Sequence, residues 1–455
     1  MDTPAKTPPA TLGTLLALAG PIIISRASQT VVGLSDALMV AHLGAAALAA
    51  TATGALNAYT VLILPMGITF IVSSFASQLA GQGDVAGARR YGWYGLLVAV
   101  GALFVSLAAI PLVDPVLSLL SYTDEVRLLM GAYMRIRLLS VGAAIGIEAL
   151  ANYYGGLGRT WPGMVANLFA MVFNVIGNWL LIDGHWGLPG LGVSGSAWAS
   201  SIATTIGFVA FFLFFLSEAK PEARVKLHGA EFGRMLKFGL PSGLNWLVEF
   251  GAFVFFANVV VGGLGTAALA VMNSVMSINS VSFMPALGLA SAGAILVGQA
   301  IGAGRKDEVP GVVKLTAFTA LVWQCSVGLI CVLIPSLLMS FFAKGEGAAD
   351  VAAIGARMLM ISAAWQVFDA INMSVAESLR GAGDTFFPML ARIAIAWVVF
   401  VPGSYITVRY FGWGDVGATL WLVAYLALLA ITLFLRFRAG SWRHIQMVEG
   451  APPAH

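Results

Sequence analysis

Charged residues are scarce in this sequence, and their scarcity sets its class. Asp, Glu, Lys and Arg make up 10% of the 455 residues, whereas a soluble domain carries about 25%. Hydrophobic residues make up 59%, and apolar runs of roughly 20 residues, the length of a membrane-spanning helix, recur from end to end. This composition excludes a soluble globular domain. Because lipid offers no hydrogen-bond partners to an open sheet, it predicts an all-α polytopic membrane protein.

Cysteine and the motifs of common enzymes are also lacking. The two cysteines, Cys325 and Cys331, lie in one apolar stretch, which excludes a disulfide framework and favours plain packing. The sequence has no GxxxxGK[ST] motif, so ATP-driven transport by this chain alone is not expected, and it has no HExxH or other metal-ligand spacing. We expect no enzyme, no nucleic-acid partner and no cofactor other than a coupling ion.

The apolar runs predict twelve transmembrane helices. Their expected bounds are 13–38, 47–80, 92–120, 127–155, 162–183, 192–217, 234–260, 266–300, 312–342, 350–379, 387–410 and 414–436. If the N-terminus is cytoplasmic, Lys and Arg concentrate in the inside loops, and the outside loops hold only Arg127, Lys344 and Arg409. The positive-inside rule therefore predicts a multi-pass membrane protein with both termini cytoplasmic.

The two halves of the sequence repeat each other. "HLGAAALAA" (42–50) is similar to "GLGTAALAV" (263–271), and "GGLGRTWP" (155–162) is similar to "RGAGDTFFP" (380–388). Because each repeat contains an even number of spans, both copies have the same topology. This predicts two pseudo-symmetric six-helix bundles with a substrate site between them.

A polar stretch at the midpoint separates the repeats. It predicts an N-terminal lobe over 1–217, a cytoplasmic linker over 218–233, and a C-terminal lobe over 234–455 that ends in a short cytoplasmic tail. Each lobe would then hold six spans.

Long motifs carry a resemblance to a known family. They are "GLSDALMVAHLG" in the first span, "GGLGRTWPGMVANL" before the fifth, "NVIGNWLLIDGHWGLPGLGVSGSAWAS" (174–200) and "FDAINMSVAESLRGAGDT" (368–385). With these, nearly the whole chain resembles the multidrug and toxic compound extrusion (MATE) transporters, closest to the bacterial NorM-like branch. The resemblance implies a secondary-active antiporter, here expected to be a monomer, that exports drugs and lipophilic cations in exchange for H⁺ or Na⁺. The alternative is a lipid or polysaccharide-precursor flippase of the same superfamily, which would line its cavity with Arg and Lys.

Carboxylates within apolar spans are functional candidates, because a charge at mid-membrane costs at least about 2.5 kcal/mol. Asp36 lies in the first span, and Asn174 and Asn178 share one face of the fifth. The carboxylate and two amide oxygens, joined by Ser196, could hold Na⁺, or a buried Asp36 could carry a proton. The resemblance implies that Asp36 and the two asparagines form the coupling site of the N-terminal lobe. The alternative is structural: Asp36 caps a helix end, the asparagines link neighbouring helices, and Ser196 eases packing.

In the C-terminal lobe the family carries acidic residues in spans seven and ten. Glu249 and Asp369 match those positions, although the repeat offset carries Asp36 to Ala257. NorM-like relatives often have a tyrosine four residues before the span-ten acid, where this chain has Trp365. An indole offers only an N–H donor and a π face. This departure argues against a sodium site of that make-up and leaves proton coupling or an aromatic contact with the drug as alternatives.

The other charged groups in the spans leave alternatives open. For Glu148, a local ion pair and a second proton carrier are equally good interpretations. Arg26 either pairs with a buried acid or reaches the membrane surface, and Glu377 is expected to pair with Arg380, three residues on.

Aromatic and Met side chains could receive flat cations by stacking and adaptable packing. Ordinary core packing is the competing explanation for each of them. The candidates are Tyr59, Trp246, Phe253, Met272, Met276 and Phe283.

Overall fold

The chain is helical wherever the structure describes it. The computed structural model describes residues 10–218, 226–342 and 348–448, and no strand occurs within them. Eleven helices in this part are long and apolar enough to cross a membrane, or twelve if one bent pair counts as a single span. The predicted all-α polytopic fold is confirmed. Lys344, one of the three basic residues predicted outside, and part of the predicted linker lie outside the described residues.

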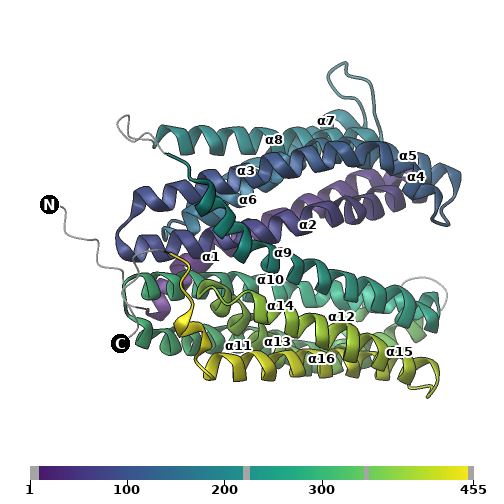
Figure 1. The fold of residues 1–455 in the computed structure, drawn as a ribbon. Helices are drawn as coiled ribbons and strands as arrows, with labels where there is room; N and C mark the ends of the chain where they lie inside the picture. The colour runs from purple at the N-terminus through teal and green to yellow at the C-terminus, as the bar shows by residue number, and fades with distance from the viewer. Residues whose placement is uncertain (1–9, 219–225, 343–347, 449–455) are drawn as a thin grey trace. The chain divides into compact units, whose positions relative to one another are not determined.

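Figure 1 shows the helices as long, roughly parallel rods within each half of the chain. The helices of the first half are α1 (Leu12–Val40), α2 (Ala45–Gln82), α3 (Val85–Ala109), α4 (Val113–Ser118), α5 (Asp124–Leu139), α6 (Val141–Gly156), α7 (Trp161–Ile182) and α8 (Val193–Ser217). Those of the second half are α9 (Gly229–Phe255), α10 (Thr266–Gly302), α11 (Val309–Leu333), α12 (Pro335–Ser340), α13 (Ala348–Gly381), α14 (Phe386–Ile393), α15 (Val401–Arg409) and α16 (Gly414–Arg438). Short 3₁₀ and π segments join several of them, among them η1 (Ala41–Leu43), η3 (Phe256–Val261), η4 (Gly262–Leu264) and η6 (Ala394–Phe400).

The predicted fourth span is bent. Helices α5 and α6 pass the length and hydropathy test together but are bent by 46° at a short break. Ser140 lies at this break, and its hydroxyl donates to the carbonyl of Arg137 at 2.9 Å. Such side-chain bonds compete with the helical ladder and bend helices, which accounts for one span becoming two helices.

The structure divides the chain into two compact units. One comprises Gly20–Gly243, and the other comprises Leu244 onwards together with the residues before Gly20. The two divisions fall beside prolines, Pro21 within α1 and Pro241 within α9. The predicted boundaries lie elsewhere: α9 begins at Gly229, inside the predicted linker over 218–233, and its first part groups with the N-terminal unit.

The internal repeat is visible in the backbone. Gly44 and Gly265 share a φ of 112°, and each separates a 3₁₀ turn, η1 or η4, from the long helix that follows. Gly158 and Gly383 likewise adopt φ values of 78° and 91°. These φ values suit glycine because it lacks a Cβ, so the repeated glycine motifs encode the same turns twice.

Small residues set the helix packing within each unit. In the N-terminal unit α6 packs against α2, α3 and α8, and in the other unit α13 packs against α10, α11 and α16. A Cβ on Gly156 would lie 2.8 Å from the carbonyl oxygen of Ser73, and one on Gly381 would lie 2.5 Å from that of Ala294. Both glycines therefore permit backbone contact between helices, the usual role of small residues in membranes.

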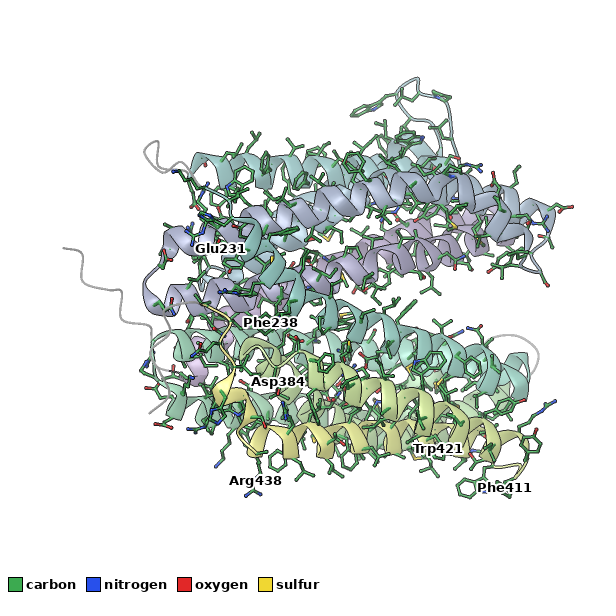
Figure 2. The ribbon with its side chains drawn as sticks, in the orientation of Figure 1. Glu231, Phe238, Asp384, Phe411, Trp421 and Arg438 are labelled. Carbon is green, nitrogen blue, oxygen red and sulfur yellow. The ribbon has the colours of Figure 1, made fainter. Side chains whose placement is uncertain are left out.

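Polar side chains at the helix ends tie segments together (Figure 2). Glu231, early in α9, accepts a bond at 2.9 Å from the hydroxyl of Tyr94 in α3. Asp384, just after α13, accepts a bond at 2.8 Å from Nε of Arg436 near the end of α16. These contacts hold neighbouring helices of one unit in register.

Candidate functional site

Asp36, near the end of α1, accepts three hydrogen bonds from neutral side chains. Asn178 Nδ2 and Asn174 Nδ2 donate to its Oδ1 at 2.6 Å and 3.0 Å. Ser200 Oγ, from α8, donates to its Oδ2 at 2.7 Å. Asp36 is 6% exposed, and none of the described Lys or Arg side chains forms an ion pair with it. The structure thus brings Asp36, Asn174 and Asn178 together; their role in coupling stays a prediction.

The two asparagines present nitrogen, not oxygen, to the carboxylate. The sequence suggested two amide oxygens as ligands for Na⁺, but both amides donate N–H groups to Asp36. The Asn178 Oδ1 atom is buried without a hydrogen-bond partner, and Asn174 Oδ1 accepts only a 3.4 Å bond from Asn178. Donors stabilise an anionic carboxylate, whereas Na⁺ needs converging oxygens. The amide orientation seen here therefore presents N–H donors rather than converging oxygens to Asp36, and the coupling ion at this site, H⁺ or Na⁺, stays a prediction.

The hydroxyl at the site belongs to Ser200 rather than Ser196. The Ser196 Oγ atom is buried and has no hydrogen-bond partner. Both serines lie on α8, where residues four apart share a face, so sequence spacing alone could not choose between them. Ser200 additionally accepts a 2.8 Å bond from Asn174 Nδ2. The prediction of Ser196 was therefore wrong by one helical turn.

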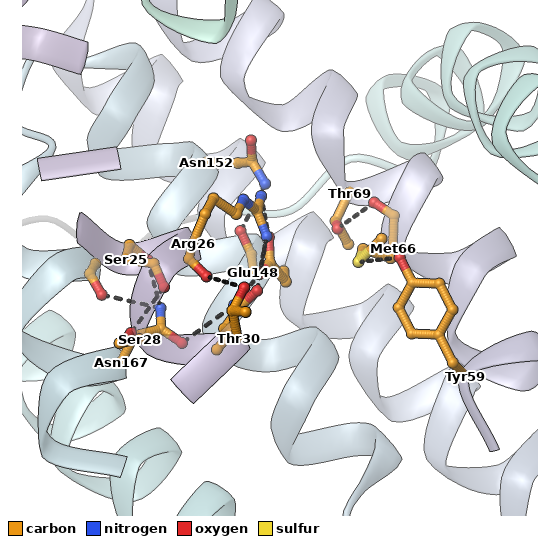
Figure 3. A network of polar contacts seen from close by, with 12 residues as sticks. Ser25, Arg26, Ser28, Thr30, Tyr59, Met66, Thr69, Glu148, Asn152 and Asn167 are labelled. Atoms are coloured by element: carbon orange, nitrogen blue, oxygen red, sulfur yellow. Dashed lines mark hydrogen bonds and ion pairs between the residues drawn. The ribbon is translucent and has the colours of Figure 1, made fainter. Parts of the chain in front are cut away.

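A second polar network joins α1 to α6 and α7 (Figure 3). Arg26 donates to Glu148 through two bonds, of 2.9 Å and 3.0 Å. Gln29 Nε2 donates to the same carboxylate at 3.0 Å and to Asn167 Oδ1 at 3.2 Å. Asn167 in turn donates to Ser25 Oγ at 2.9 Å. Of the alternatives left open by the sequence, the structure shows the ion pair: Arg26 and Glu148 neutralise each other.

Glu249, in α9, forms an ion pair with Arg392 at the end of α14. The contact joins Arg392 Nη1 to Glu249 Oε2. Arg392 is 5% exposed, while the Glu249 side chain is 30% exposed. Sequence reasoning missed Arg392, although the rule that singled out buried acids applies equally to a base inside a predicted span.

Asp369, in α13, has a single neutral hydrogen-bond partner among the described residues. Gln324 Nε2 of α11 donates to its Oδ2 at 2.9 Å. The carboxylates of Asp369 and Glu249 and the guanidinium of Arg392 lie close enough to interact electrostatically. The C-terminal acids thus lie in one cluster with a base.

A buried polar stripe continues from Asp369 along α13. Ser282 Oγ donates to Gln366 Oε1 at 3.0 Å, and Gln366 Nε2 donates to Asn279 Oδ1 at 2.8 Å. Asn279 also donates to Ser362 Oγ at 3.2 Å. Ser362, Gln366 and Asp369 recur at helical spacing in an apolar span, a signal that could have found them.

Trp365 lies away from polar partners. It is buried in a hydrophobic core that includes Met272 and is contacted by Met276. The structure therefore places Met272 and Trp365 in the core of the C-terminal unit and Met276 against it, while a contact of any of them with a substrate stays a prediction.

The other lining candidates are more open. Trp246 and Phe283 pack together on a small cluster around Ala286 and Met373. Phe253 is half-buried, and the Tyr59 hydroxyl contacts the sulfur of Met66 at 4.0 Å (Figure 3). Their contact with a substrate stays a prediction.

Ion pairs also occur at the helix ends. Arg380 Nε donates to Glu377 at 3.1 Å, the local pairing expected from their spacing. Glu218, just after α8, accepts bonds from Arg159 at 2.7 Å and from Tyr154 at 2.8 Å. Burial opposes ionisation of Glu218, but the bonds from Arg159 and Tyr154 outweigh it and hold the pKa of the carboxyl below its ordinary value. The bond to Glu218 correspondingly raises the pKa of Arg159.

Within residues 10–218, 226–342 and 348–448, no group of three or more His, Cys, Asp and Glu side chains is arranged to hold a metal ion. The candidate sites act through hydrogen bonds and charge. One is centred on Asp36 in the N-terminal unit, and the other contains Glu249, Asp369 and Arg392 in the C-terminal unit.

The chain is similar over most of its length to multidrug resistance proteins and to solved MATE structures. The "Multidrug resistance protein PmpM" of Pseudomonas aeruginosa is 28% identical over 97% of this chain and 94% of its own length. The "Multidrug resistance protein NorM" of Burkholderia vietnamiensis is 28% identical over 92% of each. Among solved structures, "Crystal structure of MATE in complex with MaL6" matches with a TM-score of 0.85 at 22% identity, over 95% of this chain and 97% of that one. "Outward-facing conformation of a multidrug resistance MATE family transporter of the MOP superfamily" matches with a TM-score of 0.84 at 21% identity, over 95% and 96%.

The family model described as MatE matches most of the chain. It covers residues 21–180 and 241–406, one block in each repeat. The blocks include Asp36, Asn174, Glu249 and Asp369. The chain therefore belongs to the MatE family of transporters and is not an enzyme.

Proposed function

We propose that the protein is a secondary-active multidrug exporter that expels organic cations in exchange for protons. Its similarity to PmpM and NorM multidrug resistance proteins supports drug efflux. The observation that carries the coupling mechanism is Asp36: a carboxylate in a membrane-spanning helix, held by three neutral donors and by no basic partner in the described chain. Such a group can take up and release a cation without displacing a resident basic side chain.

The proposed cycle uses the charge of Asp36. A proton entering from outside neutralises the carboxylate, and the loss of negative charge weakens the hold on a cationic drug. The drug leaves outward, and the transporter then turns to face the cytoplasm, where the proton is released. Arg26 and Glu148 take no proton in this cycle, because each already neutralises the other.

The flippase alternative is less well supported by the buried charges. A polyanionic headgroup requires unpaired basic groups in the cavity. Arg26 and Arg392 are each paired with a carboxylate, whereas Arg137, near the break between α5 and α6, forms no ion pair among the described residues. Asp36 and Asp369 lack an Arg or Lys ion-pair partner in the described residues, so the net deep charge is negative and suits a cationic substrate.

The proposed location follows the basic residues and the relatives. We place the protein in a bacterial inner membrane, as a monomer with cytoplasmic termini, since the loops rich in Lys and Arg then lie inside.

Ethidium efflux from cells that lack their own pumps tests the function. We expect the parent protein to export ethidium and Asp36→Asn to abolish export at equal expression, with Glu249→Gln and Asp369→Asn reducing it. The double variant Arg26→Gln/Glu148→Gln is the matched control, because it removes buried charges that the cycle does not use. Unchanged efflux in Asp36→Asn, Glu249→Gln and Asp369→Asn would contradict the proposal.

A further inference from the structure

Arg392 is a buried base whose surroundings do not satisfy it. It lies at the end of α14 and is 5% exposed. Its ion pair is with Glu249, and its Nε atom is buried without a hydrogen-bond partner. A guanidinium carries five donors, so one carboxylate contact leaves it incompletely bonded. A group this costly to bury indicates a function beyond packing.

The backbone next to Arg392 is held against the segment that carries Glu249. The π-helical segment η6 begins two residues after it, and π-helical turns are frequent at functional sites. Trp397, within η6, donates through Nε1 to the carbonyl oxygen of Val248 at 3.3 Å. Val248 immediately precedes Glu249, so the Trp397 bond fixes the segment that carries Arg392 against the segment that carries Glu249.

The charges around Arg392 indicate that its guanidinium takes the place of an inorganic cation. Glu249 and Asp369 are two acids whose carboxylates interact electrostatically, and together they would carry two negative charges. Gln324 bonds Asp369 through its nitrogen, and its Oε1 atom is buried without a partner. Two neighbouring carboxylates are typical ligands for a small inorganic cation. In this chain a guanidinium is already bound to one of the two carboxylates.

We propose that Arg392 is the resident cation of the C-terminal acids and excludes an inorganic cation from Glu249 and Asp369. A tethered side chain has a high effective concentration and loses little translational freedom on pairing, so it outcompetes a free ion of equal charge. Arg392 thereby determines ion specificity: it leaves Asp36 as the carboxylate open to the coupling ion. The inference concerns binding, so its failure is distinguishable from failure of the proposed drug export.

Sodium-22 binding to purified full-length protein tests the inference. Asp36→Asn serves as background, so that the N-terminal unit contributes no cation binding. We expect no saturable binding in this background. Adding Arg392→Gln should create saturable one-to-one binding, accompanied by a rise in Tm of about 2 °C at saturating sodium. Adding Glu249→Gln as well should abolish both effects.

Matched variants separate charge from structure. Arg392→Lys keeps the positive charge and should bind no sodium, and Arg357→Gln, which removes an exposed base paired with Asp415 in the same unit, should also bind none. Arg392→Met keeps an unbranched buried side chain and is the second variant if Arg392→Gln does not fold. Saturable sodium binding in Asp36→Asn alone that Glu249→Gln removes would overturn the inference. Sodium binding by the Lys variant would do so too, as would a folded Gln or Met variant without sodium binding.

Discussion

Arg26 and Glu148, 122 residues apart in the sequence, meet through two hydrogen bonds of 2.9 Å and 3.0 Å. The pair fastens α1 to α6 within the N-terminal unit, and Gln29 adds a third bond to the same carboxylate. Since Asp36 lies further along α1, the pair also fixes the helix that carries the proposed coupling group. Its contribution is structural, which separates it from Asp36.

Removing one member of this pair should destabilise the protein more than removing both. Glu148→Gln or Arg26→Gln alone leaves an unpaired buried charge, and we expect each to cost about 3 kcal/mol. The double variant should cost less than either single variant. Thermal unfolding in detergent measures the order of the three, and an additive double variant would show that the two side chains are not coupled.

The hydroxyl of Ser200 should matter where that of Ser196 does not. Ser200→Ala removes a hydrogen bond to an ionised carboxylate, so we expect a loss of about 2 kcal/mol together with reduced efflux. Ser196→Ala removes a hydroxyl without a hydrogen-bond partner and should leave stability and efflux near the parent values. Parallel unfolding and ethidium measurements on the two variants check this, and equal effects at both positions would contradict the assignment.

Alanine at Gly156 should disrupt the packing of α6 on α2. Its Cβ would meet the Ser73 carbonyl at 2.8 Å and the Ser77 nitrogen at 2.9 Å, and overpacking of this kind costs about 1–3 kcal/mol. Gly101→Ala in α3 is the control, because nothing lies within 4 Å of that Cβ. We expect Gly101→Ala to be neutral or slightly stabilising. A Gly156→Ala protein with the parent Tm would contradict this prediction, because it would show that α6 and α2 can move apart without loss of stability.

Glu218 should contribute stability that disappears in acid. Its pKa in the folded protein is below its ordinary value of 4.5. The contribution is therefore complete above that ordinary value and is lost as the pH falls through the lower folded pKa. The Tm difference between the parent and Glu218→Gln should be constant near neutral pH and shrink below about pH 4.5. Asp124→Asn, whose parent side chain is 97% exposed, should show no comparable difference, and a Glu218 effect that grows in acid would refute the pairing.

Length and hydropathy were sufficient to predict the helices, because each span needs a long apolar run whatever its neighbours are. The bend between α5 and α6 was not foreseen, since a hydroxyl bonding to its own helix at Ser140 leaves the hydropathy unchanged. The repeated glycines predicted matching turns, and Gly44 and Gly265 adopt the same φ. Backbone conformations of this kind can be predicted from the local sequence.

The side-chain partners were harder to predict. The four-residue spacing put Asn174 and Asn178 on one helix face, and the family resemblance grouped them with Asp36, but the sequence does not say which end of an amide faces a carboxylate. Ser196 and Ser200 share a helix face, so only packing decides between them. Arg392 was missed although Arg26 was considered, and its pairing with Glu249 joins segments far apart in the chain.

Drug transport in proteoliposomes under an imposed proton gradient tests the role of Asp36 most directly. The parent protein should move ethidium when the proton gradient is the sole driving force, and a sodium gradient alone should not drive transport. Asp36→Asn should bind ethidium more weakly and show no gradient-driven transport, while Arg26→Gln/Glu148→Gln should retain gradient-driven transport. Proton-driven transport by Asp36→Asn at the parent rate would contradict the assignment of Asp36 as the coupling carboxylate.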